Sequence, residues 1–297
     1  MNDAMQVFDR QAVRRHRDRA AAGLNEYDFL FRQANDILID RLDDIRRAFP
    51  RVLDLGCRTG GLAAALQART GMEMMVQSDL SQAMVSQADG LRLVSDEEFG
   101  PFAPDTFDLV VSCLNLHWVN DLPGALIQIR QSLKPDGLFL AALFGGETLT
   151  ELRQAFLKAE METMGGAGPR ISPMIDIRDA GGLLQRAGFA LPVADTETLT
   201  VSYGSALKLM RDLRGMGESH SASSRRKSFT RRDTIARAAA IYGERFAGED
   251  GRMLATFEII MLTGWAPSPD QPQPLARGSG QVSLGAVLSG DDDEEKG

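Results

Sequence analysis

The stretch VLDLGCRTGGL, residues 52–62, decides the fold of this chain. A short apolar run ends next to Asp54, and a group of glycines then opens a helical pattern. In a doubly wound sheet, such a strand, tight turn and helix N-terminus lie at the carboxyl edge, where ligands bind. Loops of this kind usually carry a second glycine where this one has Arg58, so the choice of cofactor depends on that arginine.

The surrounding sequence alternates between two periods. RVLDL at residues 51–55 is followed by helical GLAAALQAR, strand-like MEMMVQS, helical SQAMVSQA and strand-like LRLV. This βαβαβ pattern indicates a mostly parallel, Rossmann-like sheet with right-handed crossovers. Further strands are expected at residues 107–114 and 138–144, within 190–203 and at 254–267.

Changes in pattern divide the chain into five segments. We expect an N-terminal helical segment at 1–49, a Rossmann-like core at 50–203 and a helical insertion or lid at 204–250. The last strand and a C-terminal segment of the core follow at 251–288, and 289–297 is an acidic tail. A like-charge run of this kind is typical of a disordered, solvated terminus.

Composition limits the class of protein. With 297 residues, 43% of them hydrophobic, the chain can bury one large core. The formal net charge is −8, and half of it comes from the terminal DDDEEKG. No apolar run approaches the roughly 18 residues that span a bilayer. The first residues lack an apolar signal region, and the two cysteines form no CxxC pair, so we expect a bacterial protein of the reducing cytoplasm.

Four residues at the first two strands form a candidate cofactor site. Gly56 and Gly60 allow a tight backbone turn after the first strand, and Asp54 lies at its end. Asp79 ends the second strand, where an acid can accept hydrogen bonds from both ribose hydroxyls of a nucleoside.

Two cofactor classes compete for this loop. A nicotinamide dinucleotide needs close approach of the backbone to its pyrophosphate, and the Arg58 side chain would stand in the way. S-adenosylmethionine has no pyrophosphate; its amino group would bind a carboxylate such as Asp54, and its carboxylate could pair with Arg58. The loop therefore favours S-adenosylmethionine, with a solvent-directed Arg58 as the alternative.

The third and fourth strands add further candidates to the same edge. Asp96 and Glu97 follow the third strand and would lie beside the adenine, and Asn115 and His117 follow the fourth. We take Asn115 and His117 as candidate catalytic residues, because an imidazole is a suitable base near neutral pH. A packed, hydrogen-bonded His117 is the alternative. The chain has three histidines and none is in an HxD or HxxxH arrangement, so we expect no metal site.

The sequence resembles class I methyltransferase-fold proteins and, within them, the family of mitochondrial complex I assembly factors that hydroxylate an arginine of a core subunit. The resemblance runs from residue 8 to about 288, and its motifs include FDR, DEEF, FDLVVSCLNLHWVNDLPGAL, FGGETLTELR, DLRGMGES, GWAP and RGSGQVSLG. It implies a seven-stranded sheet with an antiparallel last strand, and S-adenosyl-L-methionine contacts at Asp54, Gly56, Gly60, Asp79, Asp96 and Glu97.

Three functions remain open at this point. The resemblance implies a protein substrate, an arginine-bearing complex I subunit. A methyltransferase of a small acid and a non-catalytic assembly chaperone are the alternatives. The basic stretch GMGESHSASSRRKSFTRRDT at residues 215–234 reads as a lid or as a solvated connection. Because the chain is acidic overall and aromatic residues are not interleaved with these cations, we expect no nucleic-acid partner; peripheral membrane association stays open.

Overall fold

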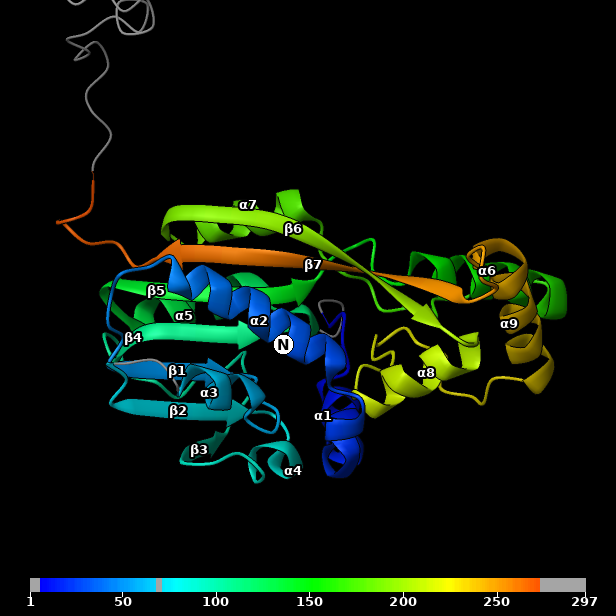
Figure 1. Cartoon of the computed structure of the whole chain (residues 1–297), viewed down its shortest axis with the longest axis horizontal. Helices are drawn as coiled ribbons and strands as arrows, with labels where there is room; N and C mark the ends of the chain where they lie inside the picture. The colour runs from blue at the N-terminus through cyan, green and yellow to red at the C-terminus, as the bar shows by residue number, and fades with distance from the viewer. Residues whose placement is uncertain (1–5, 68–70, 273–297) are drawn as a thin grey trace, which may run out of the picture. The chain divides into compact units, whose positions relative to one another are not determined.

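The computed structural model describes residues 6–67 and 71–272. Seven strands form a mixed sheet in the order β3-β2-β1-β4-β5-β7-β6 (Figure 1). The strands are β1 (Arg51–Leu55), β2 (Met74–Asp79), β3 (Leu91–Val94), β4 (Phe107–Cys113), β5 (Leu133–Phe144), β6 (Ala190–Tyr203) and β7 (Met253–Trp265). Neighbours among β1 to β5 are parallel, and β7 is antiparallel to both β5 and β6. The predicted mostly parallel sheet with an antiparallel last strand is therefore confirmed.

Helices cover both faces of the sheet. Figure 1 shows α2 and α3 on the near face and α5 and α7 on the far face. Several helices begin at a capping side chain, because an Asp or Ser oxygen satisfies a free N–H of the first turn. The helices are α1 (Arg10–Ala20), η2 (Ala21–Glu26), α2 (Phe29–Asp43), α3 (Gly61–Leu66), α4 (Gln82–Val85), η3 (Leu116–Trp118), α5 (Leu122–Ser132), α6 (Thr150–Met164), α7 (Ile177–Arg186), α8 (Ala206–Gly215) and α9 (Arg232–Phe246).

The strand period of two sends side chains to two hydrophobic cores. On β5, Leu138 and Leu140 pack on the side of α2, and Phe139 and Ala141 pack on the side of α5 and α7. All four side chains are fully buried. Strands buried on both faces read as continuous apolar runs, which is why this strand could be recognised in the sequence.

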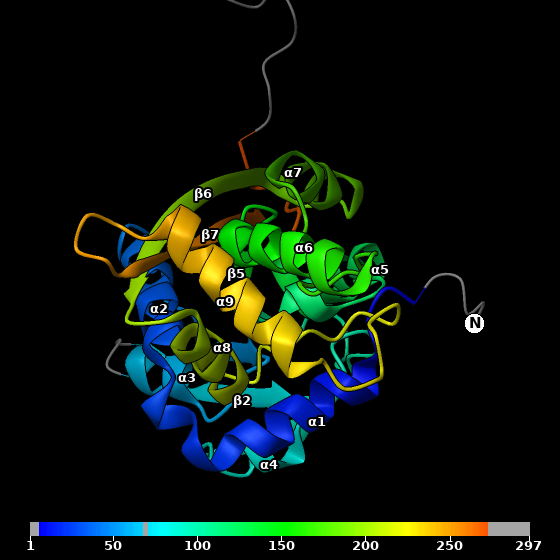
Figure 2. The same ribbon diagram turned by 90° about the vertical axis from the view of Figure 1, so that its right-hand side faces the viewer.

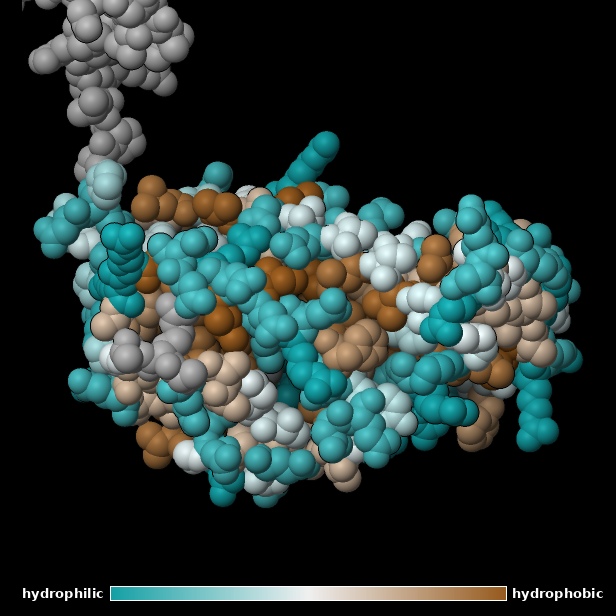
Figure 3. All heavy atoms as spheres, in the orientation of Figure 1, coloured by the Kyte–Doolittle hydropathy of each residue, from teal (hydrophilic) through white to brown (hydrophobic). Residues whose placement is uncertain are grey.

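The carboxyl ends of the parallel strands are covered by helices from distant parts of the chain. In Figure 2, which looks onto this edge, α1 from the N-terminus lies beside α8, and α9 lies beside α6 and α8. Strands β6 and β7 extend past the others toward these helices (Figure 1). Figure 3 shows hydrophilic side chains over much of the near face, with hydrophobic ones between them. The carboxyl edge, where the candidate residues lie, is thus enclosed by the two helical segments that flank the core in sequence.

Residues up to Pro267 form one compact unit, and residues from Ser268 belong to a second one. The 204–250 segment contributes α8, a long connection and α9 to the first unit. Of the second unit the structure describes residues 268–272, in which the Gln271 N–H donates to the Ser268 carbonyl at 3.2 Å. The predicted acidic tail at 289–297 and the RGSGQVSLG motif lie outside the described residues.

Candidate active site

The turn after β1 needs glycine at two of its predicted positions. Gly56 has φ +81°, and a Cβ atom there would overlap the side chain of Asn115. Gly60 has φ +85° and precedes the first residue of α3. Because left-handed backbone and close approach both exclude a side chain, these glycines bring the backbone of the loop against the end of β4. The predicted loop therefore lies at the carboxyl edge, beside Asn115.

Asp54 is a buried acid that lacks a partner. Its side chain is 1% exposed, and neither carboxylate oxygen has a hydrogen-bond partner among the described residues. Burial, reinforced by the negative charge of Asp79, raises the pKa of Asp54 to about 7, against a smaller opposing effect of Arg58. A buried carboxylate left without donors is energetically unfavourable, so this position is suited to a cationic ligand group.

Asp79, by contrast, is fully engaged. Its Oδ2 accepts the main-chain N–H of Arg58 at 3.0 Å, and its Oδ1 accepts the N–H of Ser81 at 2.7 Å. The same Oδ1 also lies 3.3 Å from a guanidinium nitrogen of Arg17, a residue of α1. The acid predicted to bind ribose hydroxyls therefore has a protein cation beside it.

Two arginines of α1 lie against the acids at the carboxyl edge of the sheet. Arg17 is 1% exposed and donates to Glu97 at 3.3 Å and to the Oδ1 atom of Asn115. Arg10 donates to Asp96 at 2.6 Å and to Glu97. Burial opposes ionisation of Glu97, but the charges of Arg10 and Arg17 lower its pKa to about 2. The structure thus brings together the predicted Asp79, Asp96, Glu97 and Asn115, and it adds two arginines that sequence reasoning did not assign to the site.

Arg58 turns inward. It is 5% exposed, so the alternative of a solvent-directed side chain is wrong. Its guanidinium donates to the carbonyls of Cys113 at 2.8 Å and Leu114 at 2.6 Å and to Glu218 at 2.7 Å. Its backbone has φ +51°, a left-handed conformation in which glycine would be unstrained. Pairing of Arg58 with the cofactor carboxylate stays a prediction; its Nε atom is buried and has no hydrogen-bond partner among the described residues.

His117 and Trp118 both donate to one acid from the insertion. Oε2 of Glu218 accepts from Trp118 Nε1 at 2.8 Å and lies 3.1 Å from His117 Nε2. Burial lowers the pKa of His117, although the hydrogen bond to Glu218 acts against this. Burial would raise the pKa of Glu218, but His117 and the charges of Arg58 and Arg17 lower it to about 2. Nδ1 of His117 lies 3.5 Å from the main-chain nitrogen of Phe144. The imidazole predicted to act as a base therefore has neighbours at both ring nitrogens.

A cavity of about 180 Å³ lies against Trp118 and Glu218. Its apolar wall includes Phe156 of α6, and its polar lining includes His220. His220 Nδ1 is 2.8 Å from the hydroxyl of Ser172, and its Nε2 is buried with no hydrogen-bond partner among the described residues. A side chain of a substrate fits this combination of apolar wall and unused polar atom.

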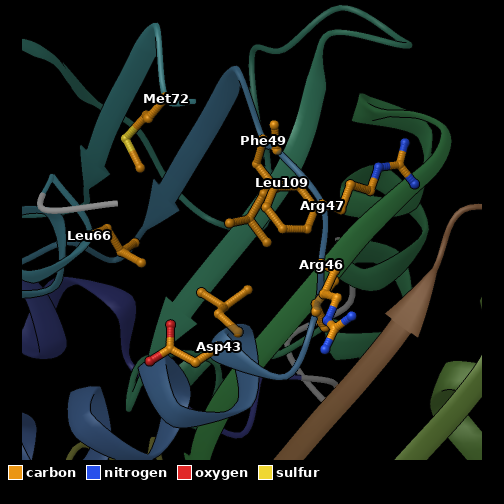
Figure 4. Close-up of a pocket in the computed structure, with 10 residues that line it drawn as sticks. Asp43, Arg46, Arg47, Phe49, Leu66, Met72 and Leu109 are labelled. Carbon is orange, nitrogen blue, oxygen red and sulfur yellow. The ribbon is translucent and has the colours of Figure 1, made fainter. Parts of the chain in front are cut away.

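A larger cavity of about 550 Å³ lies elsewhere, near the amino ends of β1 and β4 (Figure 4). Phe49, Leu66 and Leu109 line it, and Arg46 and Arg47 extend from the same segment as Phe49. None of the predicted site residues lines this cavity or the 180 Å³ one, but the smaller cavity is lined by Glu218, which contacts Arg58 and His117. Ligands of open α/β sheets bind at the carboxyl edge, so we assign the site to the smaller cavity and the acids at that edge.

Within residues 6–67 and 71–272, no group of three or more histidine, cysteine or acidic side chains is arranged to hold a metal ion. Over the same residues, no helix is both long and apolar enough to span a membrane.

Comparison with known proteins agrees with this geometry. The sheet order, the glycine loop and the acids at the carboxyl edge define an S-adenosylmethionine-dependent methyltransferase of class I. The family described as "Methyltransferase domain" matches residues 25–192, and the chain belongs to this family of enzymes. A solved structure with the same fold is phosphoethanolamine N-methyltransferase 2 of Haemonchus contortus, in complex with S-adenosylhomocysteine. It has a TM-score of 0.54 and 17% identity, covering 86% of this chain and 60% of that one.

Two curated relatives extend over nearly the whole chain. "Arginine-hydroxylase NDUFAF5, mitochondrial" of Danio rerio is 44% identical over 287 residues, 94% of this chain and 89% of the relative. "Malonyl-[acyl-carrier protein] O-methyltransferase" of a Methylovorus species is 32% identical over 288 residues, 91% of this chain and 95% of the relative. Both matches extend well beyond the domain matched by the family, so they include segments outside the core.

The cofactor is S-adenosyl-L-methionine, and the residues of the cleft fit it. The unpartnered carboxylate of Asp54 can accept hydrogen bonds from an ammonium group. The side chain of Asn115 packs against Gly56 of the loop. Asp79 and Glu97 are acceptors of the kind that bind ribose hydroxyls and an exocyclic amine. Because Arg17 already donates to both acids, cofactor binding requires Arg17 to share or release them.

Proposed function

We propose that this protein uses S-adenosyl-L-methionine and modifies an arginine side chain of a protein substrate, a subunit of respiratory complex I. The observation that supports this most is the 44% identity to an arginine hydroxylase over 94% of the chain. That match includes the insertion, whose Glu218 contacts both Arg58 of the cofactor loop and His117 of η3, the short helix after β4.

The residues of the site divide into two groups under this proposal. Asp54 would hold the cofactor's ammonium group, and Asp79 and Glu97 would hold its nucleoside. When bound, the cofactor supplies an electrophilic methyl group, which serves methyl transfer. It supplies no oxygen atom, so hydroxylation of the arginine would also consume an oxidant, either molecular oxygen together with two electrons and two protons or an equivalent two-electron oxidant. Trp118 and Glu218 line the 180 Å³ cavity, where the substrate side chain would lie, and Glu218 also contacts Arg58 of the cofactor loop. The protein then contributes orientation of the two partners and exclusion of water.

A second candidate is methyl transfer to a small acid. The malonyl-carrier methyltransferase of Methylovorus supports it, with 32% identity over 91% of the chain. The cavity also offers Arg170, and His220 can donate from Nε2 in one tautomer, so a carboxylate could be held there. A non-catalytic chaperone that holds an unassembled subunit is the third candidate.

We further infer a bacterial protein of the cytoplasm, without nucleic-acid partners, that meets the membrane only peripherally. The two free, buried cysteines, Cys57 and Cys113, support a reducing compartment. Cell fractionation with antibody detection tests this setting, and recovery from an oxidising compartment would contradict it.

Mass spectrometry of complex I subunits from deletion and complemented strains tests the activity. We expect one arginine that gains a single oxygen atom in the complemented strain and lacks it in the deletion strain. A methyl group at a carboxylate of any protein or carrier would favour the second candidate. Identical modification in both strains, together with loss of assembly in the deletion strain, would favour the chaperone.

A further inference from the structure

The connection between α8 and α9 exposes a cluster of cations around one aromatic ring. We call residues 225–232 the basic loop; it contains Arg225, Arg226, Lys227, Arg231 and Arg232. Within it Phe229 is fully exposed, at 101% of its reference surface. Exposed aromatic rings are disfavoured on monomer surfaces and enriched at the centres of protein interfaces. The loop therefore has the composition of a binding surface.

The loop is held at both ends. Arg225 donates to Asp9 at 2.7 Å, and Phe8 forms an antiparallel bridge with Ala222 just before the loop. Near the other end, the hydroxyl of Thr230 accepts from Arg170 at 2.8 Å. Figure 2 shows this connection, in yellow, passing close to the start of α1. Phe229 therefore projects from a segment whose flanks are fixed, and a preorganised surface loses less entropy on binding.

The basic loop is adjacent to the 180 Å³ cavity. Arg170 lines that cavity and also donates to Thr230, which follows Phe229 directly. His220 lines it too, with its Nε2 buried and unpartnered among the described residues. A macromolecule bound at Phe229 would therefore lie where one of its side chains could enter the cavity.

Charge indicates the kind of partner. The stretch 225–233 carries five basic residues and one acid, Asp233, in a chain whose net charge is −8. Arg226, Lys227 and Arg232 are all exposed. A basic surface on an acidic protein attracts an acidic partner locally, while the remaining surface repels it.

We propose that the basic loop is the docking surface for an acidic segment of the protein substrate, with Phe229 buried in the complex and the modified side chain placed in the cavity. This inference rests on the proposed function. A lipid surface would be recognised by an amphipathic face of several apolar residues, whereas the loop presents one ring. Single-stranded nucleic acid would be recognised by several stacking rings.

A photo-crosslinking amino acid at position 229 of the full-length protein, expressed in its own cells, identifies the partner. We expect a crosslink to the subunit whose arginine modification disappears in the deletion strain. Crosslinks to lipid or nucleic acid would overturn the docking surface. Where a subunit is modified, crosslinks to a different protein would overturn it as well.

Steady-state kinetics with that purified subunit then measure docking. Phe229→Ser and the charge reversal Arg226→Glu/Lys227→Glu should each raise KM at least about tenfold, as expected for interface hot spots, with kcat retained. Leu191→Ser and Arg186→Glu, exposed residues outside the loop, are the matched controls and should leave KM unchanged. Affinity for S-adenosyl-L-methionine should be the same in all four variants.

The outcomes separate the two proposals. If the subunit is modified and the loop variants keep the wild-type KM, the docking surface is wrong and the proposed function stands. If no subunit is modified, the proposed function is wrong, and the crosslink alone then decides whether the loop binds an acidic protein. Binding of the wild type to phosphatidylglycerol vesicles that Phe229→Ser abolishes, with subunit binding intact, would also overturn the docking surface.

Discussion

The carboxyl edge of the sheet and the insertion each contribute one buried acid to the candidate site, and the two acids have opposite surroundings. Asp54, on β1, has no hydrogen-bond partner among the described residues, and its pKa is raised to about 7. Glu218, after α8, accepts from Arg58, His117 and Trp118, and its pKa is lowered to about 2. The difference shows which acid stabilises the fold and which is left for a ligand.

The largest loss of stability should come from removing Glu218, the acid that is fully hydrogen-bonded. Glu218→Leu would leave the buried guanidinium of Arg58 and the N–H groups of His117 and Trp118 without their acceptor. Breaking a buried ion pair of this kind typically lowers the free energy of unfolding by about 3–5 kcal/mol. Urea unfolding followed by circular dichroism measures this change.

Asp54→Asn is the matched variant, because it removes the other acid of the cleft. We expect it to preserve or increase stability, since an unfavourable buried charge is lost. The pH dependence sharpens the contrast: the contribution of Glu218 is fully present above its ordinary pKa of 4.5 and is lost as the pH falls toward about 2. Equal destabilisation by the two variants would invalidate the comparison.

Removing Arg17, the cation beside the acids assigned to cofactor binding, should have the next largest effect on stability. Arg17→Met takes a buried donor away from Asp79, Glu97 and Asn115, but these residues keep other partners. We therefore expect a loss of about 2–3 kcal/mol in the free energy of unfolding. Arg14→Met, an exposed change on the same helix, should stay within about 0.5 kcal/mol. If Arg17→Met left the free energy of unfolding unchanged, the contacts of α1 with the carboxyl edge would not stabilise the fold.

Lowering the pH should have a moderate effect, a loss of affinity for the cofactor. Cofactor ammonium binding favours ionised Asp54, whose pKa in the free protein is about 7. Affinity for S-adenosyl-L-methionine should therefore be constant above that value and fall by up to about tenfold per pH unit below it. Calorimetric titration between about pH 5.5 and 8 measures the dependence, which Asp54→Asn should abolish. A wild-type affinity that does not vary with pH would remove Asp54 from the cofactor site.

The smallest effect is expected where an ion pair is partly exposed. Lys134 Nζ lies 2.8 Å from Asp108 Oδ1, with the lysine side chain 34% exposed. Because solvent screens such a pair, Lys134→Gln should lower the free energy of unfolding by only about 0.2–1 kcal/mol. Thermal unfolding at low and high salt tests this, and a loss comparable to that of Glu218→Leu would show that burial does not govern these energies.

The fold could be predicted because its signals are local. Buried parallel strands appear as apolar runs, and left-handed turns appear as glycines such as Gly56 and Gly60. The order of acids after successive strands then placed Asp79, Asp96 and Glu97 at one edge. Each of these inferences needs only the neighbouring residues and the rules of strand connection.

The partners of those acids could not be predicted, because they come from far along the chain. Arg17 meets Asp79 from 62 residues away, and Glu218 meets His117 from 101 residues away. The motifs FDR and DLRGMGES contained Arg10 and Glu218 but gave no indication of which group each would contact. A charged residue on a polar helix is usually solvated, so the burial of Arg17 depends on how α1 packs across the edge.

The length of β6 has a consequence for self-association. As the terminal strand of the sheet it has no neighbouring strand on one side among residues 6–67 and 71–272, so one side of a 14-residue backbone is a template on which another chain could pair. Figure 3 shows hydrophobic side chains near its start, where Leu191 and Val193 are exposed. Two features interrupt the regular edge formed by this strand. They are a register shift between Ala190 and Val193 and the ion pair of Asp195 with Arg41. Protection against edge-to-edge aggregation thus depends on a few residues at the end of the sheet remote from catalysis.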